Sequence, residues 1–389
     1  MVLQILSFVL LALAAFGVFA LSVQAIATHL HVRRPPRVPR AVRGVSILKP
    51  LCGLDDELER TLEHFARLSW PASELLLGVK DTDDAAFPLA HALARRFPER
   101  VRVVVQRGSP AMNPKVNQLI TLARAARFDL LMVSDSNAII EAGALDEIVA
   151  HFEDPTVGCV ANPVSGRGHQ TLGALLDNLH LASFLGPGQI AAKAFGRDVI
   201  IGKSMTLRRD VLEAMGGFAR FGDHAAEDFA LGVAVSQHGF RNVIARHPVW
   251  NVAVHRGVRS FFDRYRRWAV LQRTGVTLPT SLAQGLLNPW PLSVLAWAAS
   301  PGLQSASACA AVLVARIVID VSSARAMQLT PLRAHVVPAL VVKDVLIFLA
   351  WFEGLFRRTI WWRGNRLVVA PGGLLLRPAV ASESLEGAR

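Results

Sequence analysis

The sequence predicts an α/β domain with a parallel sheet, joined at both of its ends to helices that cross or enter a membrane. Three observations predict this class. Residues 1–30 contain no Asp, Glu, Lys or Arg, and residues 274–315 are also uncharged. Residues 44–273 between them carry most of the acids and alternate short β-rich runs with helical patterns. With 52% hydrophobic and 19% charged residues, the chain is neither a disordered protein nor composed like an ordinary soluble enzyme.

The N-terminal stretch Val2–Leu30 is long enough to span a bilayer, which needs about 20 apolar residues. A secretory signal peptide is the weaker interpretation, because the start lacks basic residues and no small-residue cleavage site precedes the arginines. Residues 31–43 hold five arginines and no acid. By the positive-inside rule this flank is cytoplasmic and the N-terminus lies outside.

Between these membrane regions, four apolar runs alternate with three helical patterns. The expected strands are 45–49, 74–80, 101–105 and 129–134, and the expected helices are 54–68, 85–97 and 115–126. This alternation predicts parallel strands joined by crossover helices, and such sheets bind ligands beyond the carboxyl ends of their strands. Asp81 and Asp135 stand at two such ends. No glycine-rich dinucleotide or phosphate-binding loop occurs.

The C-terminal third offers three apolar segments, and Pro301-Gly302 separates the first two, about 281–300 and 303–322. The third segment, 334–352, carries Lys343-Asp344, and charges at membrane depth are costly unless they are paired. The flanking arginines all favour the cytoplasmic side: Arg325, Arg333, Arg357, Arg358, Arg363 and Arg366. Three full spans would place the last four outside, so we expect one segment to be re-entrant or interfacial.

These boundaries give four regions. They are an N-terminal transmembrane helix at 1–30, a cytoplasmic catalytic domain at 44–273, membrane segments at 274–356 and a cytoplasmic tail at 357–389. The segment 172–195 has a helical apolar stripe and fits either a core helix or an interfacial helix.

The net charge of +12 comes from 42 basic against 30 acidic residues. Such an excess suits a membrane surface, an anionic small substrate or a nucleic acid. The chain has one tyrosine and no run that alternates basic and aromatic residues, so we expect no nucleic-acid partner. Its three cysteines are widely spaced, which predicts neither a disulfide framework nor a zinc site and favours a reducing compartment.

Taken singly, each acidic motif has a structural explanation. Acids that follow strands often cap the next helix, and Glu227-Asp228 could offset a helix dipole. Arginines just before a membrane segment could face lipid. The ordered set of acidic and basic motifs is harder to explain in this way.

In that order, the motifs resemble those of the ceramide glucosyltransferases, inverting enzymes with the GT-A fold of the nucleotide-sugar transferases, and the resemblance covers nearly the whole chain. Asp81, Asp135 and Glu227-Asp228 match three successive acidic motifs of that family, and the segment from Arg264 through Arg267 to Trp268 matches its Arg/Gln-x-x-Arg-Trp motif. Four further segments resemble the family's: 46–54, 113–117, 207–218 and 361–366.

The resemblance implies a UDP-sugar donor and a divalent cation, Mg²⁺ or Mn²⁺, because such a cation stabilises the charge of a departing diphosphate. Asp135 is then the metal ligand, and Asn137, where many relatives have an acid, is a second ligand or a ribose contact. Asp81 and Lys49 would help to hold the uridine, and Lys115 would meet the diphosphate or the sugar.

Inversion needs a base for the incoming hydroxyl, and Asp228 is the candidate, positioned by Glu227. Arg264 and Arg267 would clamp the diphosphate, since guanidinium groups suit phosphate geometry, and Trp268 would either stack on a substrate or pack in the core.

The expected reaction moves a sugar, glucose first, from a UDP-sugar to the primary hydroxyl of ceramide, at a multi-pass integral membrane protein with a cytoplasmic catalytic domain, in the inner membrane if the source is bacterial. Three alternatives stay open. One is a transferase for hopanoids or other lipids, with UDP-N-acetylglucosamine as a donor. The others are a processive polysaccharide synthase and a non-catalytic membrane protein that binds nucleotide sugars or lipids. The oligomeric state is not predicted.

Overall fold

The computed structural model describes residues 1–329, 335–362 and 365–376. Arg333, Arg363 and the tail from residue 377 therefore lie outside the described residues. The chain forms two compact units. We call the first the sheet unit; it comprises His31–Gly168 and Ala192–Val254. The second, the helical unit, comprises Met1–Leu30, His169–Ala191 and His255–Arg389. The predicted 44–273 region is thus divided, because residues 169–191 within it and 255–273 at its end belong to the helical unit.

A seven-stranded sheet forms the core of the sheet unit, in the order β3-β2-β1-β4-β8-β6-β9. Its strands are β1 (Val45–Pro50), β2 (Ser73–Val79), β3 (Val101–Val105), β4 (Leu130–Ser134), β6 (Val157–Ala161), β8 (Ser204–Arg208) and β9 (Arg241–Ile244). Strands β1, β2 and β4 are almost completely buried, which explains their continuous apolar runs. A smaller sheet, in the order β5-β10-β7, contains β5 (Ala138–Ile140), β7 (Val164–Arg167) and β10 (Val249–Val252).

The sheet unit has five main helices: α2 (Leu58–Ala66), α3 (Phe87–Arg96), α4 (Pro114–Ala125), α5 (Ala144–His151) and α9 (Glu227–Gln237). Two short helical elements accompany them, the six-residue α8 (Arg209–Ala214) after β8 and η2 (Phe218–Phe221). The predicted strands and helices up to residue 134 are all present, within a few residues of their expected ends. The strands β3, β2, β1 and β4 are parallel, as predicted.

Strand β8 breaks this parallel pattern, because it runs antiparallel to both β4 and β6. Its first residue, Ser204, pairs with Ser134, the last residue of β4. The start of β8 therefore lies at the same edge of the sheet as the carboxyl end of β4, and this edge carries the charged residues described below.

The helical unit consists of long helices and a three-stranded antiparallel sheet. Its helical elements are α1 (Val2–Val32), α6 (Leu172–His180), the π-helical turn η1 (Leu181–Leu185), α7 (Gly186–Ala194), α10 (Val258–Gly275), α11 (Leu278–Ala283), η3 (Gln284–Leu287), α12 (Pro289–Ala299), α13 (Leu303–Ala326), α14 (Val336–Phe356) and η4 (Pro371–Gly373). Its strands are β11 (Thr359–Trp362), β12 (Asn365–Val369) and β13 (Leu375–Leu376).

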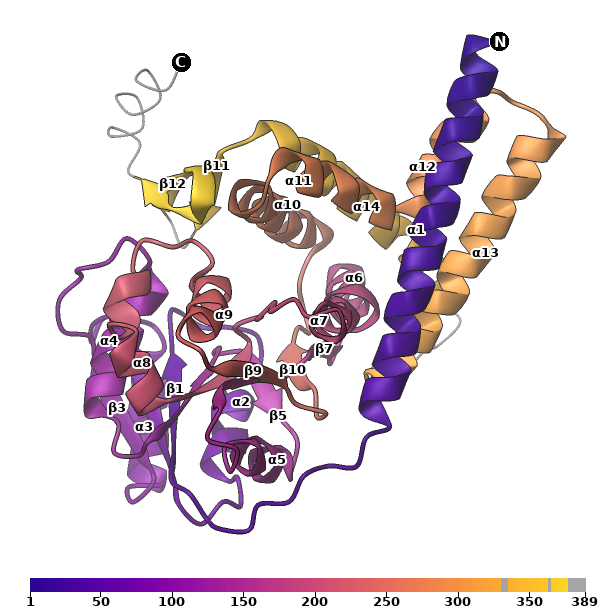
Figure 1. Cartoon of the computed structure of the whole chain (residues 1–389). Coiled ribbons are helices and arrows are strands. Elements are labelled where there is room, and N and C mark those ends of the chain that lie inside the picture. The colour runs from indigo at the N-terminus through magenta and orange to yellow at the C-terminus, as the bar shows by residue number, and fades with distance from the viewer. Residues whose placement is uncertain (330–334, 363–364, 377–389) are drawn as a thin grey trace. The chain divides into compact units, whose positions relative to one another are not determined.

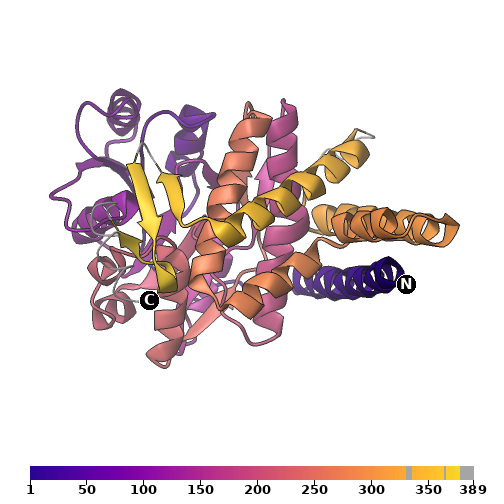
Figure 2. The ribbon, with the colours of Figure 1, turned by 90° about the horizontal axis from the view of Figure 1, so that it is seen from above.

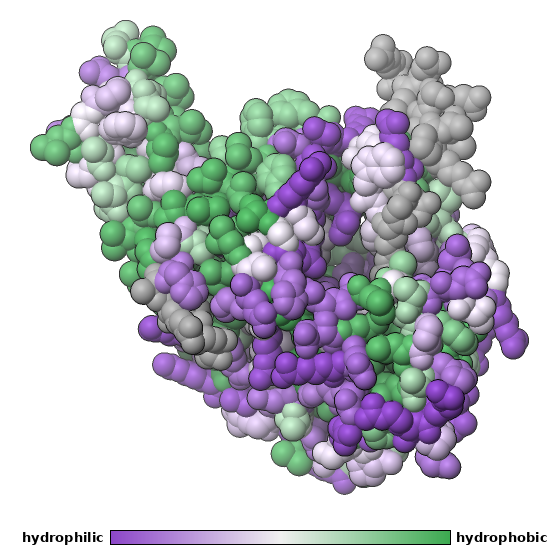
Figure 3. All heavy atoms as spheres, turned by 180° about the vertical axis from the view of Figure 1, so that it is seen from behind, coloured by the Kyte–Doolittle hydropathy of each residue, from purple (hydrophilic) through white to green (hydrophobic). Residues whose placement is uncertain are grey.

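Two described helices, α1 and α13, are long and apolar enough to cross a membrane. They run side by side (Figures 1 and 2), and His29 near the end of α1 bonds Ser322 near the end of α13 at 2.8 Å. Both helices expose large apolar side chains, among them Phe8, Phe19 and Val318, and hydrophobic residues cover this part of the unit in Figure 3. In water this exposure is unfavourable, whereas in lipid it is expected.

The predicted span at 281–300 is not a single helix. The chain forms α11, the short η3 and then α12, whose eleven residues are too few for a bilayer that needs about 20. Pro289 and Pro291 stand in the first turn of α12, where proline begins a helix rather than continuing one. This segment is therefore not a single helical span in this structure, and the expected number of full spans stays a prediction.

Helix α14 contains the Lys343-Asp344 pair, and both side chains are paired inside the helical unit. The Nζ atom of Lys343, which is fully buried, lies 2.6 Å from Asp320 of α13, and the Asp344 carboxylate lies 2.8 Å from the Nε atom of Arg316. Arg316 also contacts Asp320 at 2.8 Å. Two cations and two anions thus neutralise one another, which explains how an apolar helix carries them.

Helix α6 is buried along its whole length after Leu172, so this part of the 172–195 segment packs in the core, whereas Phe195 at the end of the segment is exposed. The polar residues of α6 are enclosed as well. His180 stacks on Phe184 and meets the edge of Tyr265, with ring centroids 5.1 and 4.5 Å away. A sequence stripe shows which face is apolar, but it does not reveal that the polar face is also covered.

The buried ion cluster predicts an asymmetry between single and double substitutions. Lys343→Met leaves Asp320 and Asp344 with one cation between them, and breaking a buried pair costs about 3–5 kcal/mol of unfolding free energy. Adding Asp320→Asn restores neutrality, so the double variant should recover much of the loss. Thermal unfolding in detergent measures both, and equal melting temperatures for the single and double variants would contradict the pairing.

Candidate active site

The centre of the candidate site is Asp135, directly after β4. Its carboxylate accepts from two lysines, Lys115 at Oδ1 and Lys203 at Oδ2, each at 2.9 Å. Burial alone would oppose ionisation, but the two ammonium groups hold the pKa of Asp135 well below its usual range. The side chain is still 24% exposed, so this charged group remains at the surface of the sheet edge.

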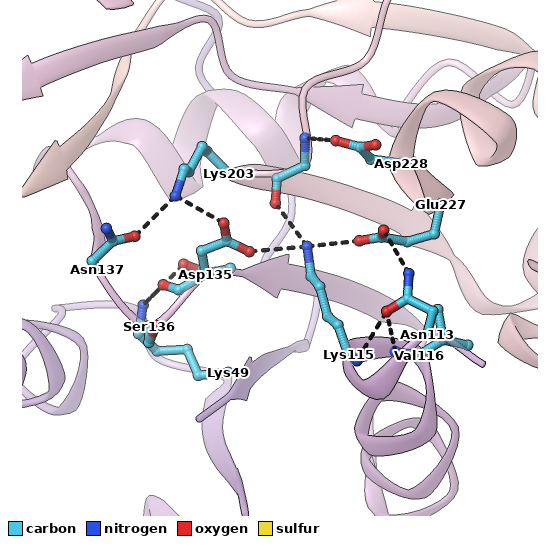
Figure 4. Close-up of polar contacts among 12 residues, drawn as sticks. Lys49, Asn113, Lys115, Val116, Asp135, Ser136, Asn137, Lys203, Glu227 and Asp228 are labelled. Atoms are coloured by element: carbon cyan, nitrogen blue, oxygen red, sulfur yellow. Dashed lines mark hydrogen bonds and ion pairs between the residues drawn. The ribbon is translucent and has the colours of Figure 1, made fainter. Parts of the chain in front are cut away.

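Lys115 reaches Asp135 from the first turn of α4 (Figure 4). Asn113 caps this helix by accepting from the backbone N–H groups of Lys115 and Val116, and Pro114 occupies the first helical position. The Lys115 ammonium lies between Asp135 and Glu227, 2.8 Å from the latter. Although burial works against its charge, these carboxylates hold the pKa of Lys115 well above its usual range.

Glu227 and Asp228 form the first turn of α9, where acids are favoured by the helix dipole. Glu227 is buried and accepts from Asn113 at 3.0 Å as well as from Lys115. Asp228 is partly exposed, and its carboxylate accepts from the backbone N–H groups of Gly202 and Phe229. The two acids therefore suit the positive end of the helix dipole and also belong to the candidate site.

The surroundings of Asp228 change its pKa. Withdrawal from water, and then the negative charge of Glu227, raise the pKa of Asp228 to about 6, while Lys115 opposes the rise. A carboxylate with such a pKa is ionised at neutral pH and is more basic than an ordinary aspartate, which suits a general base.

Lys49 lies beneath the site rather than at its surface. Its side chain is fully buried, and its ammonium donates to Ser134 Oγ and to the carbonyls of Asp135 and Ala138 at 2.7–3.0 Å. Burial lowers its pKa well below the usual range, while three oxygens accept from it. Lys49 thus fixes the loop that carries Asp135. A contact between Lys49 and a uridine stays a prediction.

Asp81 stands after β2, as predicted, and its side chain is 49% exposed. It accepts from the backbone of Asp83 at 3.1 Å. The neighbouring Asp84 accepts from the backbone of Gly53 at 2.9 Å and so joins this loop to the one that follows β1. Asp84 therefore shapes the sheet edge on which Asp81 is exposed.

The residues at Asp135 fit a divalent cation in their chemistry. Asp135 Oδ2 and Asn137 Oδ1 both lie 2.9 Å from one point, which the Nζ atom of Lys203 occupies. Hard cations prefer such oxygen ligands and often combine one or two protein oxygens with substrate phosphates. Among the described residues no group of three or more His, Cys, Asp or Glu side chains could hold a metal ion, so substrate oxygens would have to complete the shell.

The three residues of the Arg-x-x-Arg-Trp motif lie on α10, in the helical unit. Arg264 is buried and bonds Asp177 of α6 at 2.9 Å, and Tyr265 donates to the same carboxylate at 2.8 Å. The Arg264 guanidinium also lies over the Trp268 ring, 5.2 Å from its centroid. Arg267 and Trp268 are partly exposed. The predicted contacts of all three with a donor stay predictions.

Sequence reasoning missed Lys203, Gly202 and Asn113 as parts of the site. Lys203 faces Asp135 because β8 is antiparallel, and strand direction cannot be read from an apolar run. Asn113 could have been found as a helix cap, since it precedes Pro114 at the start of a helical pattern. Gly202 has no side chain, and its role appears only in the close approach to Asp228.

Comparison with known proteins places these features in a family. The family model described as "Glycosyl transferase family 21" matches residues 9–375. "Ceramide glucosyltransferase 3" from Caenorhabditis elegans is 24% identical over 93% of this chain and 79% of its own length. "Ceramide glucosyltransferase 1" from the same organism is 28% identical over 63% of this chain and 52% of its own.

Among solved structures, a similar fold occurs in the mannosyltransferase PcManGT from Pyrobaculum calidifontis, determined in complex with GDP-Man and Mn²⁺. The TM-score is 0.52 at 19% identity, over 88% of this chain and 99% of that one. The predicted α/β fold of the GT-A type is confirmed by this likeness.

The close approach of Gly202 to Asp228 predicts a stability effect. A Cβ atom at Gly202 would lie 2.8 Å from the Asp228 carboxylate oxygen, so Gly202→Ala should destabilise the protein by about 1–3 kcal/mol. Gly275→Ala is the matched control, because nothing lies within 4 Å of its Cβ position. Thermal unfolding compares the two variants, and a Gly202→Ala protein as stable as the control would refute the contact.

Proposed function

Since the chain belongs to glycosyl transferase family 21, we propose that it is a membrane-bound inverting hexosyltransferase that moves glucose from UDP-glucose to the primary hydroxyl of ceramide. The observation that carries this proposal is the arrangement at one sheet edge. There Lys115 links Asp135, a carboxylate placed for a cation, to Glu227, and the pKa of the neighbouring Asp228 is raised to about 6.

The proposed reaction is a single displacement. Asp228 takes the proton of the acceptor hydroxyl while that oxygen attacks the anomeric carbon and UDP departs from the opposite face. Glu227 pairs with Lys115 and positions Asp228 at the start of α9. No covalent intermediate is needed, so the configuration at the anomeric carbon inverts.

The donor diphosphate would be met by the cationic side chains at this edge. Lys115 and Lys203 both point toward Asp135 (Figure 4), and we assign their ammonium groups to the donor phosphates. A divalent cation, Mg²⁺ or Mn²⁺, held by Asp135 with Asn137, would supply further stabilisation of the leaving diphosphate. Asp81 would contact the uridine, and the roles that the family resemblance implies for Arg264, Arg267 and Trp268 stay predictions.

The membrane helices support a lipid acceptor. Moving a lipid alcohol into water costs about 0.8 kcal/mol for each CH₂ exposed, so an enzyme for such a substrate gains by residing in the bilayer. The His29–Ser322 bond joins the C-terminal ends of α1 and α13. Arg33 and Arg34 follow the end of α1, and Arg325 lies in the last turn of α13. By the positive-inside rule we assign these ends to the cytoplasm.

The acceptor and the sugar are the finer parts of the proposal. Ceramide is favoured because the curated relatives are named ceramide glucosyltransferases. A hopanoid or another lipid with an exposed hydroxyl, and UDP-N-acetylglucosamine as the donor, form the second candidate, since the same base and cation pocket would serve that transfer.

The role of Asp228 predicts a distinctive variant. Asp228→Asn keeps the size of the side chain but cannot accept a proton, so it should bind UDP-glucose with near-normal affinity and lose at least about 10²-fold in kcat. Calorimetric titration with UDP-glucose and a product assay separate the two effects. Full turnover by this variant would remove Asp228 as the base.

The pH profile refines this prediction. Because Asp228 must be deprotonated, kcat should fall as pH drops through about 6. The charge of Glu227 raises the pKa of Asp228, so in Glu227→Gln this acidic limb should move to lower pH. A limb that stays in place, or moves to higher pH, would contradict the assignment.

The whole function is tested by lipid mass spectrometry. The chain is expressed in a host without glycosphingolipids and supplied with ceramide, with Asp228→Asn as the inactive control. A new hexosyl-ceramide absent from the control is the expected result. A sugar-extended hopanoid in a hopanoid-producing host would favour the second candidate, and no new glycolipid in either host would overturn the transferase proposal.

A further inference from the structure

We propose that Lys203 occupies the divalent-cation position in the free protein, so that the cation enters only together with the donor diphosphate, which then becomes the partner of Lys203. This inference rests on the proposed function, because it takes the donor to be a nucleoside diphosphate sugar. It assigns a role to a residue that the acidic motifs alone do not reveal.

The first support is geometric. The Nζ atom of Lys203 lies 2.9 Å from Asp135 Oδ2 and 2.9 Å from Asn137 Oδ1, and these are the two protein oxygens that a cation would take. The two residues are separated by Ser136, as in a cation-binding acidic motif with one member replaced by an amide. A cation and the ammonium cannot share this point, so one must leave when the other binds.

The second support is the local charge. Three lysines, Lys49, Lys115 and Lys203, gather around Asp135, and Lys115 connects them to the acids at the start of α9. A divalent cation that arrived alone would add two positive charges beside the ammonium groups of Lys115 and Lys203, which is unfavourable among partly buried groups.

The third support is what the donor brings. Its diphosphate carries about two negative charges, which would restore the balance and give the displaced ammonium a new partner. Lys203 is tethered directly before β8 and pairs through its carbonyl with the Asp135 backbone at 3.2 Å, so only its side chain has to turn. Binding of cation and donor is therefore cooperative, with Lys203 as the exchangeable group.

Replacing Lys203 tests this directly, without any turnover. In Lys203→Met the Asp135–Asn137 pair loses its competitor, so Mn²⁺ alone, titrated by electron paramagnetic resonance, should bind on the order of tenfold tighter than to the wild type. UDP titrated in the presence of EDTA should bind more weakly, because an anion partner is lost. Unchanged Mn²⁺ affinity in the variant would overturn the proposal.

Lys193→Met is the matched control. It also removes one lysine of the sheet unit from an ion pair, with Asp198 at 2.8 Å, but it lies outside the site. Its Mn²⁺ and UDP affinities should equal those of the wild type. If they change as much as those of Lys203→Met, the effect is one of net charge and the proposal fails.

A measurement on the wild type keeps the proposal testable if the variant does not fold. Linkage requires that UDP raise the affinity for Mn²⁺ by the same factor by which Mn²⁺ raises the affinity for UDP. We expect a factor on the order of ten or more. Equal Mn²⁺ affinity with and without UDP would refute the exchange while leaving the transferase proposal intact, whereas no UDP binding under any condition would refute the proposed donor itself.

Discussion

The ion pairs of Asp135 with Lys115 and Lys203 hold the candidate site together. They join the end of β4, the start of α4 and the residue before β8, which are far apart in the sequence. Burying one carboxylate between two ammonium groups is stable only because each lysine has another acceptor as well, Glu227 for Lys115 and Asn137 for Lys203. Because each charged group here has more than one partner, these contacts fix one arrangement of the sheet edge.

Much of this edge could be predicted from the sequence. The apolar runs that end at Asp81 and Asp135 identify strands buried on both faces, and a parallel sheet brings their carboxyl ends together. Glu227-Asp228 is also legible, since two adjacent acids before an apolar run suit the first turn of a helix. Local rules suffice for these residues because each rule acts within one element.

The remaining features depend on contacts between elements, which local patterns do not encode. The antiparallel direction of β8 places Lys203 opposite Asp135, and a five-residue strand reads the same in either direction. Likewise the Lys343-Asp344 pair looks prohibitive in an apolar helix until Arg316 and Asp320 are seen to neutralise it. Lys49 is a similar case, because a lysine in a strand gives no sign that three oxygens will surround its ammonium in the interior.

Lys115, which stabilises Asp135, also affects the two acids at the start of α9 differently. Burial, and then the negative charge of Glu227, raise the pKa of Asp228, while Lys115, which contacts Glu227 directly, opposes the rise. Two adjacent acids in one helical turn thereby receive different tasks: Glu227 pairs with Lys115, and Asp228 is a base near neutrality. Because Lys115 also faces the proposed diphosphate site, the charge that would receive the donor and the basicity that would activate the acceptor depend on one side chain. Such a shared dependence on Lys115 suits a transfer reaction, because the donor and the acceptor must both be bound when the sugar is transferred.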